Sequence, residues 1–289
     1  MNDIKVSICI PAYQQPEYLK RALLSIFEQT YNDYEVIISD DSPDDSVLDV
    51  VKEFDDKRIK YFKNDEIKGS PENWNVCIDN ATGEYIKILH HDDWFTEKDS
   101  LFKFVKMLDD NPDTDLAFSA SANCRQDTKL KNIFCTPIIK LHKLRQNPMF
   151  LFTGNIIGSP SATIYRRKIN KKFDKNLKWV VDIDFYLNIL LDNPEIVFCK
   201  EPLISVLTES ENRVTSFCRY NKSVELPEYI YLYSKYIKMM NFAQTRFICR
   251  LLYIYKIKSE KELKDLGIKI PKNILFYIMM FLNRAIKMS

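Results

Sequence analysis

The chain has 289 residues, of which 46% are hydrophobic and 28% are charged, and its formal net charge is +2. This length and composition suit a soluble protein with a sizeable core, organised as one large α/β domain with an appendage or as two modest domains. Its seven cysteines show no CxxC spacing, which argues against a zinc site and indicates reduced thiols in a cytosolic protein.

The first 120 residues alternate between strand and helix patterns. Strands are expected at 6–10, 34–39, 59–62, 85–89 and 116–120, and helices at 17–29, 47–54, 70–81 and 101–108. Such alternation predicts βαβ units and a Rossmann-like, mostly parallel sheet flanked by helices. The pairs Asp40-Asp41 and Asp92-Asp93 each follow a strand, so both are expected at the same sheet edge, where ligands bind.

The second half of the chain is less regular. Residues 121–180 hold turn-rich segments, and the pockets for a donor sugar and an acceptor are expected there. Trp179 to Asp184 open an apolar helix, and everything after about residue 222 reads as helical. The sequence therefore predicts a domain at 1–220 and a helical, basic and aromatic region at 221–289.

A nucleotide pocket is expected where the first two strands end. Pro11 and Tyr13 follow the first strand, and Asp40 and Asp41 follow the second. An aromatic ring can stack on a base while a carboxylate accepts its imide N–H, a combination that favours uracil. The alternative is that Tyr13 is a surface aromatic and the acids cap the next helix. Neither GxGxxG nor GxxxxGK[ST] occurs, which disfavours a dinucleotide fold or a P-loop.

The other acids have two interpretations each. Asp92 and Asp93 could hold Mg²⁺ or Mn²⁺ against a diphosphate, or could simply start a helix. Asp182 or Asp184 could take a proton from a hydroxyl if burial raises its pKa, or could be acids favoured by the helix dipole.

Three sequence blocks together resemble family 2 glycosyltransferases. They are VSICIPAY at 6–13, ALLSIFEQT with YEVIISDDS at 22–42, and NATGEYI at 80–86 running into Asp92-Asp93-Trp94. The resemblance is most specific over residues 4–110 and moderate over 150–210. It implies a GT-A fold, a nucleotide-sugar donor, a divalent metal (Mn²⁺ or Mg²⁺) and inversion at the anomeric carbon.

The resemblance also implies roles for single residues. Pro11, Tyr13 and one of Asp40 or Asp41 would contact the nucleoside. Asp92 would lie near the ribose and diphosphate, and Asp93 would bind the metal. Asp182 would be the base that activates the acceptor, with Asp184 as the alternate.

Three positions depart from the family pattern. His90 stands where many members have a further acid, so metal binding would depend more on Asp93. Ser42-Pro43 replaces the usual glycine after the first acidic pair. Val181 replaces the glutamate of a Glu-Asp pair, which leaves Asp182 as the expected base.

The C-terminal region is strongly basic. From Lys235 to Ser289 the chain has 12 Lys and Arg residues against 3 acids, and segments 229–240 and 273–287 mix bases with aromatic and apolar residues. An interfacial helix on an anionic membrane, a subdomain packed on the core and a dimer contact are all compatible with this pattern. Nucleic acid is not an expected partner, because the preceding residues are acidic overall. Without a signal peptide or an apolar run long enough to span a bilayer, we expect a cytoplasmic protein, peripheral at the membrane's inner face.

These observations together predict an inverting, metal-dependent glycosyltransferase. It would pass a sugar from a UDP-sugar to a hydroxyl of a glycan or lipid-linked acceptor in surface polysaccharide assembly, such as lipopolysaccharide or capsule. A non-catalytic nucleotide-sugar binder remains an alternative. A sugar-phosphate nucleotidyltransferase would need a Gly-rich, basic loop after the first strand, where residues 12–15 read Ala-Tyr-Gln-Gln.

Overall fold

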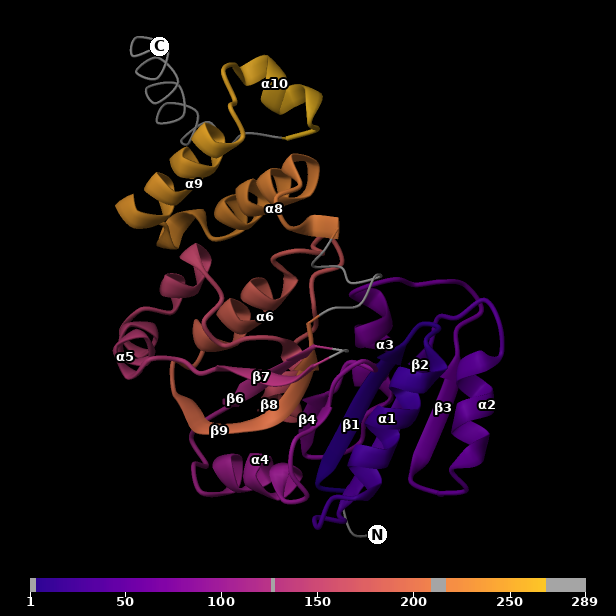
Figure 1. The fold of residues 1–289 in the computed structure, drawn as a ribbon. Coiled ribbons are helices and arrows are strands. Elements are labelled where there is room, and N and C mark those ends of the chain that lie inside the picture. The colour runs from indigo at the N-terminus through magenta and orange to yellow at the C-terminus, as the bar shows by residue number, and fades with distance from the viewer. Residues whose placement is uncertain (1–3, 126–127, 209–216, 269–289) are drawn as a thin grey trace.

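The computed structural model describes residues 4–125, 128–208 and 217–268, and Figure 1 shows its fold. Within these residues nine strands form one sheet in the order β3-β2-β1-β4-β8-β6-β9-β5, and β7 pairs with β6. The strands are β1 (Val6–Ala12), β2 (Tyr34–Asp40), β3 (Ile59–Lys63), β4 (Tyr85–Ile88), β5 (Trp94–Phe95), β6 (Leu116–Arg125), β7 (Thr128–Phe134), β8 (Thr163–Arg166) and β9 (Ile196–Leu207). The helices are α1 (Pro16–Phe27), α2 (Ser46–Glu53), α3 (Glu72–Asn80), α4 (Ser100–Asp109), α5 (Ile138–Gln146), α6 (Val181–Leu190), α8 (Lys222–Lys235), α9 (Phe242–Ile254) and α10 (Glu260–Asp265).

The N-terminal half of the sheet is parallel. β1 pairs in parallel with β2 and β4, and β2 pairs in parallel with β3. Every residue of β1 and β2 is buried, as expected for strands that helices cover on both faces. The carboxyl ends of these strands therefore lie at one edge of the sheet.

Beyond β4 the sheet is mixed. β8 runs antiparallel to both β4 and β6, whereas the long strand β9 runs parallel to β6. The short strand β5, directly after the second acidic pair, pairs antiparallel with β9. This pairing joins the segment that follows β4 to the mixed half of the sheet.

Side-chain alternation along β1 divides the core into two layers. Ile8 and Ile10 belong to a cluster that includes the buried residues of α1, α2 and α4, such as Leu19 and Phe104. Cys9, between them, belongs to the cluster of α3, α6 and the C-terminal helices. The period of two along a strand thus fills both faces of the sheet.

The described C-terminal helices pack on this second layer. Leu226 and Ile230 of α8 and Ile248 of α9 are buried in the same cluster as α6. Figure 1 shows α8, α9 and α10 stacked beyond α6, on the side opposite α4. A domain boundary at residue 220 stays a prediction, and segment 273–287 lies outside the described residues. Among those residues, no helix combines the length and apolar character that crossing a bilayer requires.

Gly83 permits the close approach of two chain segments before β4. A Cβ atom at this position would lie 2.6 Å from the backbone nitrogen of Ser7 and 2.7 Å from the carbonyl carbon of Val6. The Gly83 amide instead donates to Ser7 Oγ at 2.8 Å. Only glycine fits here, because the turn at 82–83 lies directly on the start of β1.

Candidate functional site

A cavity of about 730 Å³ lies at the carboxyl edge of the parallel strands. Pro11 near the end of β1, Tyr13 just after it, Asp41 after β2, and Asp92 and Asp93 after β4 all line it. Asp182, at the start of α6, lines the same cavity. The fold thus brings together residues from four separate segments that sequence patterns selected.

Asp40 does not line the cavity, because its carboxylate is engaged within the sheet. This fully buried group accepts hydrogen bonds from the Ser42 amide at 2.8 Å, the Tyr61 hydroxyl at 2.7 Å and Lys63 Nζ at 3.1 Å. Tyr61 and Lys63 belong to β3, so Asp40 fastens the ends of β2 and β3 together. Its contacts are those of a structural residue.

Asp41 is held by the loop that follows β3 and lies in the cavity wall. Its Oδ1 accepts from Asn64 Nδ2 at 2.7 Å and from the Lys68 amide at 3.1 Å, and its Oδ2 accepts from the Gly69 amide at 2.7 Å. A carboxylate has about four acceptor positions, so this arrangement leaves one for a ligand. Neither acid caps α2, whose N-cap residue is Asp45.

The segment after β1 is conformationally strained. Gln14 and Gln15 have φ angles of 53° and 54°, in the left-handed region that residues with a Cβ rarely adopt. The Gln14 amide donates to Ser42 Oγ at 2.7 Å. Ser42, which stands where glycine is usual, thereby anchors the strained segment. Tyr13 is 43% exposed at the rim, where its ring is open to a ligand.

His91 joins this segment to the turn after β4. Its Nδ1 lies 3.3 Å from the Pro11 carbonyl oxygen and its Nε2 lies 3.0 Å from Gln15 Oε1. Burial lowers the pKa of the imidazole, which favours its neutral form. In that form the ring has a single N–H, so it donates to one of the two oxygens and lies in contact with the other, between the two cavity walls.

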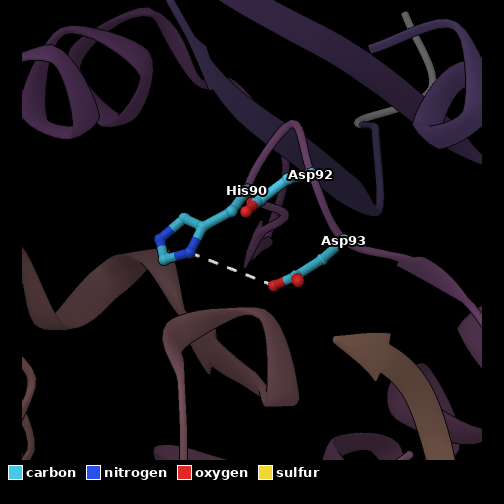
Figure 2. A group of neighbouring side chains, drawn as sticks. All are labelled: His90, Asp92 and Asp93. Atoms are coloured by element: carbon cyan, nitrogen blue, oxygen red, sulfur yellow. Dashed lines mark ion pairs between the residues drawn. The ribbon is translucent and has the colours of Figure 1, made fainter. Parts of the chain in front are cut away.

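The second acidic pair lies in a tight turn, shown in Figure 2. The Asp93 amide donates to the His90 carbonyl oxygen at 2.9 Å, which closes the turn and places both side chains near Asp92. One ligand atom from each of the three lies within 4.8 Å of the others, and His90 Nδ1 is 4.0 Å from Asp93 Oδ2. Two carboxylates together with phosphate oxygens fit Mn²⁺ or Mg²⁺, and the imidazole lies close enough to join them.

Asp182 carries an uncompensated carboxyl group. It lies in the first turn of α6, and its Oδ1 is buried without a hydrogen-bond partner among the described residues. Desolvation raises its pKa to about 7, even though the residue keeps part of its surface open to the cavity. A carboxyl group with this pKa can accept a proton near neutral pH.

Asp184, two residues further along α6, is buried outside the cavity. Its carboxylate is 2.9 Å from Lys235 Nζ and accepts a hydrogen bond from the Tyr236 hydroxyl at 2.9 Å. Burial raises its pKa, and the Lys235 ammonium opposes that shift. These contacts join α6 to α8 and favour Asp182 over Asp184 as the base.

Several cavity residues were not found by sequence reasoning. Asn73, Trp74, Trp179 and Tyr229 line the cavity. Glu228, beside Tyr229 on α8, accepts hydrogen bonds from the amides of Lys178, Trp179 and Val180 at 2.8–3.1 Å. The aromatic run in 229–240 was the available signal, but it was compatible with an interfacial helix, a subdomain packed on the core or a dimer contact, and it did not indicate a cavity wall.

Comparison with known proteins places this chain in a family. The family model described as Glycosyl transferase family 2 matches residues 7–174, more than half of the chain. An uncharacterized glycosyltransferase of Methanocaldococcus jannaschii is 26% identical over 89% of this chain and 86% of its own length. The Escherichia coli enzyme WfgD, a UDP-Glc:alpha-D-GlcNAc-diphosphoundecaprenol beta-1,3-glucosyltransferase, is 34% identical over 34% of this chain and 39% of its own.

A solved structure shares the fold over nearly the whole chain. Residues 1–349 of Staphylococcus aureus TarS, in complex with UDP-GlcNAc, superpose with a TM-score of 0.66 and 18% identity, covering 96% of this chain and 81% of that one. This likeness confirms the expected GT-A fold. With the sequence match over residues 7–174, it follows that the chain belongs to glycosyl transferase family 2.

Proposed function

We propose that the protein is an inverting glycosyltransferase that uses a UDP-sugar as donor. The observation that carries the proposal is the shared cavity: an unpartnered, buried carboxyl at Asp182 lines the same space as the turn that holds Asp92 and Asp93. Direct displacement at an anomeric carbon requires two parts. One is a base for the acceptor hydroxyl, and the other is a site that stabilises the departing diphosphate, here the acidic turn that can hold a cation.

Each residue that lines the cavity has a proposed role that follows from its position. Asp41, with one acceptor position left, would take the imide N–H of uracil, and Tyr13 and Pro11 would cover the base. Asp92 would face the ribose and diphosphate, and Asp93 would hold Mn²⁺ or Mg²⁺. Neutralising the charge of the departing diphosphate is the chemistry that a bound ion supplies. Asp182 would remove the proton of the acceptor hydroxyl as its oxygen attacks.

The acceptor is proposed from the relatives. WfgD and a Campylobacter jejuni relative, which is 39% identical over 31% of this chain and 30% of its own, are both described as acting on sugars linked to undecaprenol through a diphosphate. We propose a similar lipid-linked acceptor in surface polysaccharide assembly. Trp179 and Tyr229 give the α8 side of the cavity aromatic surfaces against which a sugar ring can pack.

The outward face of α9 offers a membrane-binding surface for such an acceptor. Phe242 and Tyr253 are 81% and 70% exposed, and Arg246 and Arg250 lie between them at helical spacing. The α9 sequence contains no acid. Exposed aromatic and basic side chains on one helical face are typical of helices that lie on anionic bilayers. We therefore propose peripheral binding through this face.

The test of the proposed reaction compares the wild-type chain with Asp182→Asn. The proteins are supplied with UDP-sugars, Mn²⁺ and a polyprenyl-diphosphate-linked sugar, and both UDP release and product are measured. We expect the variant to lose on the order of 10²–10⁴-fold in kcat, because a positioned base contributes about that much. Its affinity for UDP with Mn²⁺, measured by calorimetry, should stay within about twofold of the wild type, because Asp182 is not placed on the nucleotide.

Asp192→Asn is the matched control, since it makes the same change beyond the other end of α6. Asp192 pairs with Lys171 at 2.6 Å with 68% of its side chain exposed. Full turnover by Asp182→Asn would refute the assignment of the base, and a product with retained anomeric configuration would refute inversion. UDP binding without turnover in the wild type, across the donor panel, would favour the non-catalytic binder.

A further inference from the structure

The turn after β4 holds an imidazole in position to act as a metal ligand. His90 Nδ1 lies 4.0 Å from Asp93 Oδ2, and ligand atoms of His90, Asp92 and Asp93 fall within 4.8 Å of one another. Figure 2 shows the ring directed toward Asp93. Ligands about 2.1 Å from one ion stand roughly 3–4 Å apart, so a small contraction of this group is enough to enclose a cation.

The position of His90 is set from two sides. Its amide donates to Ser161 Oγ at 3.0 Å, and its ring packs against Trp74 with 4.8 Å between ring centroids. Ser161 is fully buried, and its carbonyl oxygen accepts from Nζ of the fully buried Lys87. The backbone and the ring plane of His90 are thus both restrained by neighbours outside the turn.

We propose that His90 is a ligand of the metal ion and makes the site selective for Mn²⁺ over Mg²⁺. Mg²⁺ strongly prefers oxygen donors, whereas Mn²⁺, although it also favours oxygen, is a transition-metal ion and accepts an imidazole nitrogen beside oxygen ligands more readily than Mg²⁺ does. An imidazole ligand brings no negative charge, so the site attracts a hard cation less than a site built from three carboxylates would. The inference rests on the proposed function, because it concerns the ion that accompanies the nucleotide.

The direct test is electron spin-echo spectroscopy of Mn²⁺ bound to the full chain with UDP. Coordination by His90 predicts modulation from an imidazole nitrogen, which changes when the protein carries ¹⁵N-histidine. The signal should vanish in His90→Asp and persist in His142→Asp, which changes an exposed histidine on α5. This measurement needs no turnover, and the wild-type spectrum alone decides the matter if His90→Asp does not fold.

Metal affinities provide the second readout. Calorimetry with UDP present should show that His90→Asp lowers the ratio of Mn²⁺ to Mg²⁺ affinity by about tenfold or more, with His142→Asp unchanged. Bound Mn²⁺ without nitrogen modulation, or an unaltered ratio in His90→Asp, would overturn the role of His90 and leave the proposed function intact. Absence of any UDP-dependent Mn²⁺ binding to the wild type would overturn both.

Discussion

Two carboxylates on one helix show how surroundings decide what a residue does. Asp182 and Asp184 are two positions apart in α6, so they point to different sides of the helix. The Asp184 carboxylate accepts hydrogen bonds from Lys235 and Tyr236, whereas Asp182 faces the cavity and its Oδ1 has no hydrogen-bond partner among the described residues. The protein thus neutralises one acid by pairing and leaves the other able to exchange a proton with a ligand.

The raised pKa of Asp182 predicts a pH dependence of turnover. A general base acts in its deprotonated form, so kcat should rise with pH through about 7 and level off above it. The profile is measured between pH 5.5 and 9 with saturating donor and acceptor. A kcat that is flat from pH 5.5 upward would show that no group of this pKa takes the proton.

The raised pKa of Asp182 also makes the stability of the fold depend on pH. The folded pKa of about 7 exceeds the unfolded value of about 3.9, so the folded state holds the proton more tightly. Protonated Asp182 therefore contributes to the free energy of unfolding fully below pH 4. The contribution is lost as the pH rises through 7, by about 1.4 kcal/mol per pH unit at most. Asp182→Asn should therefore gain stability relative to the wild type across this window, as urea titrations at pH 4, 5.5 and 7.5 would show.

Residue roles could be predicted only where they depend on nearby sequence. In the sequence, Asp40 and Asp41 are two adjacent acids at the end of a strand, and nothing nearby distinguishes them. Their difference comes from Tyr61 and Lys63, which occupy the first carboxylate, and from the amide of Gly69, which orients the second. Those donors lie more than twenty residues away, beyond the reach of a local pattern.

At the scale of elements, α8 is the main finding that the sequence did not reveal. Its helical pattern was predicted, but helical spacing does not say which segment the helix covers. Glu228 is 9% exposed and accepts from three consecutive amides just before α6, some fifty residues earlier. The helix therefore positions the loop that leads into Asp182.

Removing Glu228 should loosen that loop. Glu228→Ala leaves three backbone donors without their acceptor, and each unsatisfied donor costs about 1–3 kcal/mol if water cannot replace the bond. We expect a loss of about 2 kcal/mol or more in the free energy of unfolding, measured by urea titration, together with a lower kcat.

Glu201→Ala is the control for this change. Glu201 pairs with Lys103 at 2.6 Å with 63% of its side chain exposed, and such surface pairs contribute about 0–1 kcal/mol. Equal losses from the two substitutions would show that the Glu228 contacts add no more than a surface ion pair.

For the whole molecule, the sequence predicted the architecture well where strands are completely buried. The runs at β1, β2 and β4 and the glycosyltransferase resemblance are confirmed by the fold and by the match over residues 7–174. The mixed half around β6, β8 and β9 could not be ordered, because β8 runs antiparallel to β6 and β9 runs parallel to it, and the strand sequences do not distinguish the two directions. No periodicity along one strand encodes its partner.

The proposed membrane surface is tested on the full chain. Arg246→Glu with Arg250→Glu should weaken binding to vesicles that contain about 30% phosphatidylglycerol by more than tenfold in a sedimentation assay, because each basic residue near a bilayer contributes about 1 kcal/mol. Lys52→Glu with Lys57→Glu makes the same change in net charge around α2, where both residues are exposed. Equal weakening by the two pairs would assign binding to net charge rather than to α9.

The contacts of α8 also set an order of events during synthesis. Residues 6–93 carry the proposed nucleotide side of the cavity, but the acceptor of the amides at 178–180 is Glu228, and the partner of Asp184 is Lys235. A nascent chain that has emerged only to residue 208 would therefore hold the donor-side groups without the helix that fixes the base. The ability to bind a sugar nucleotide would arise before the ability to transfer it, so a truncated chain would sequester donor rather than consume it.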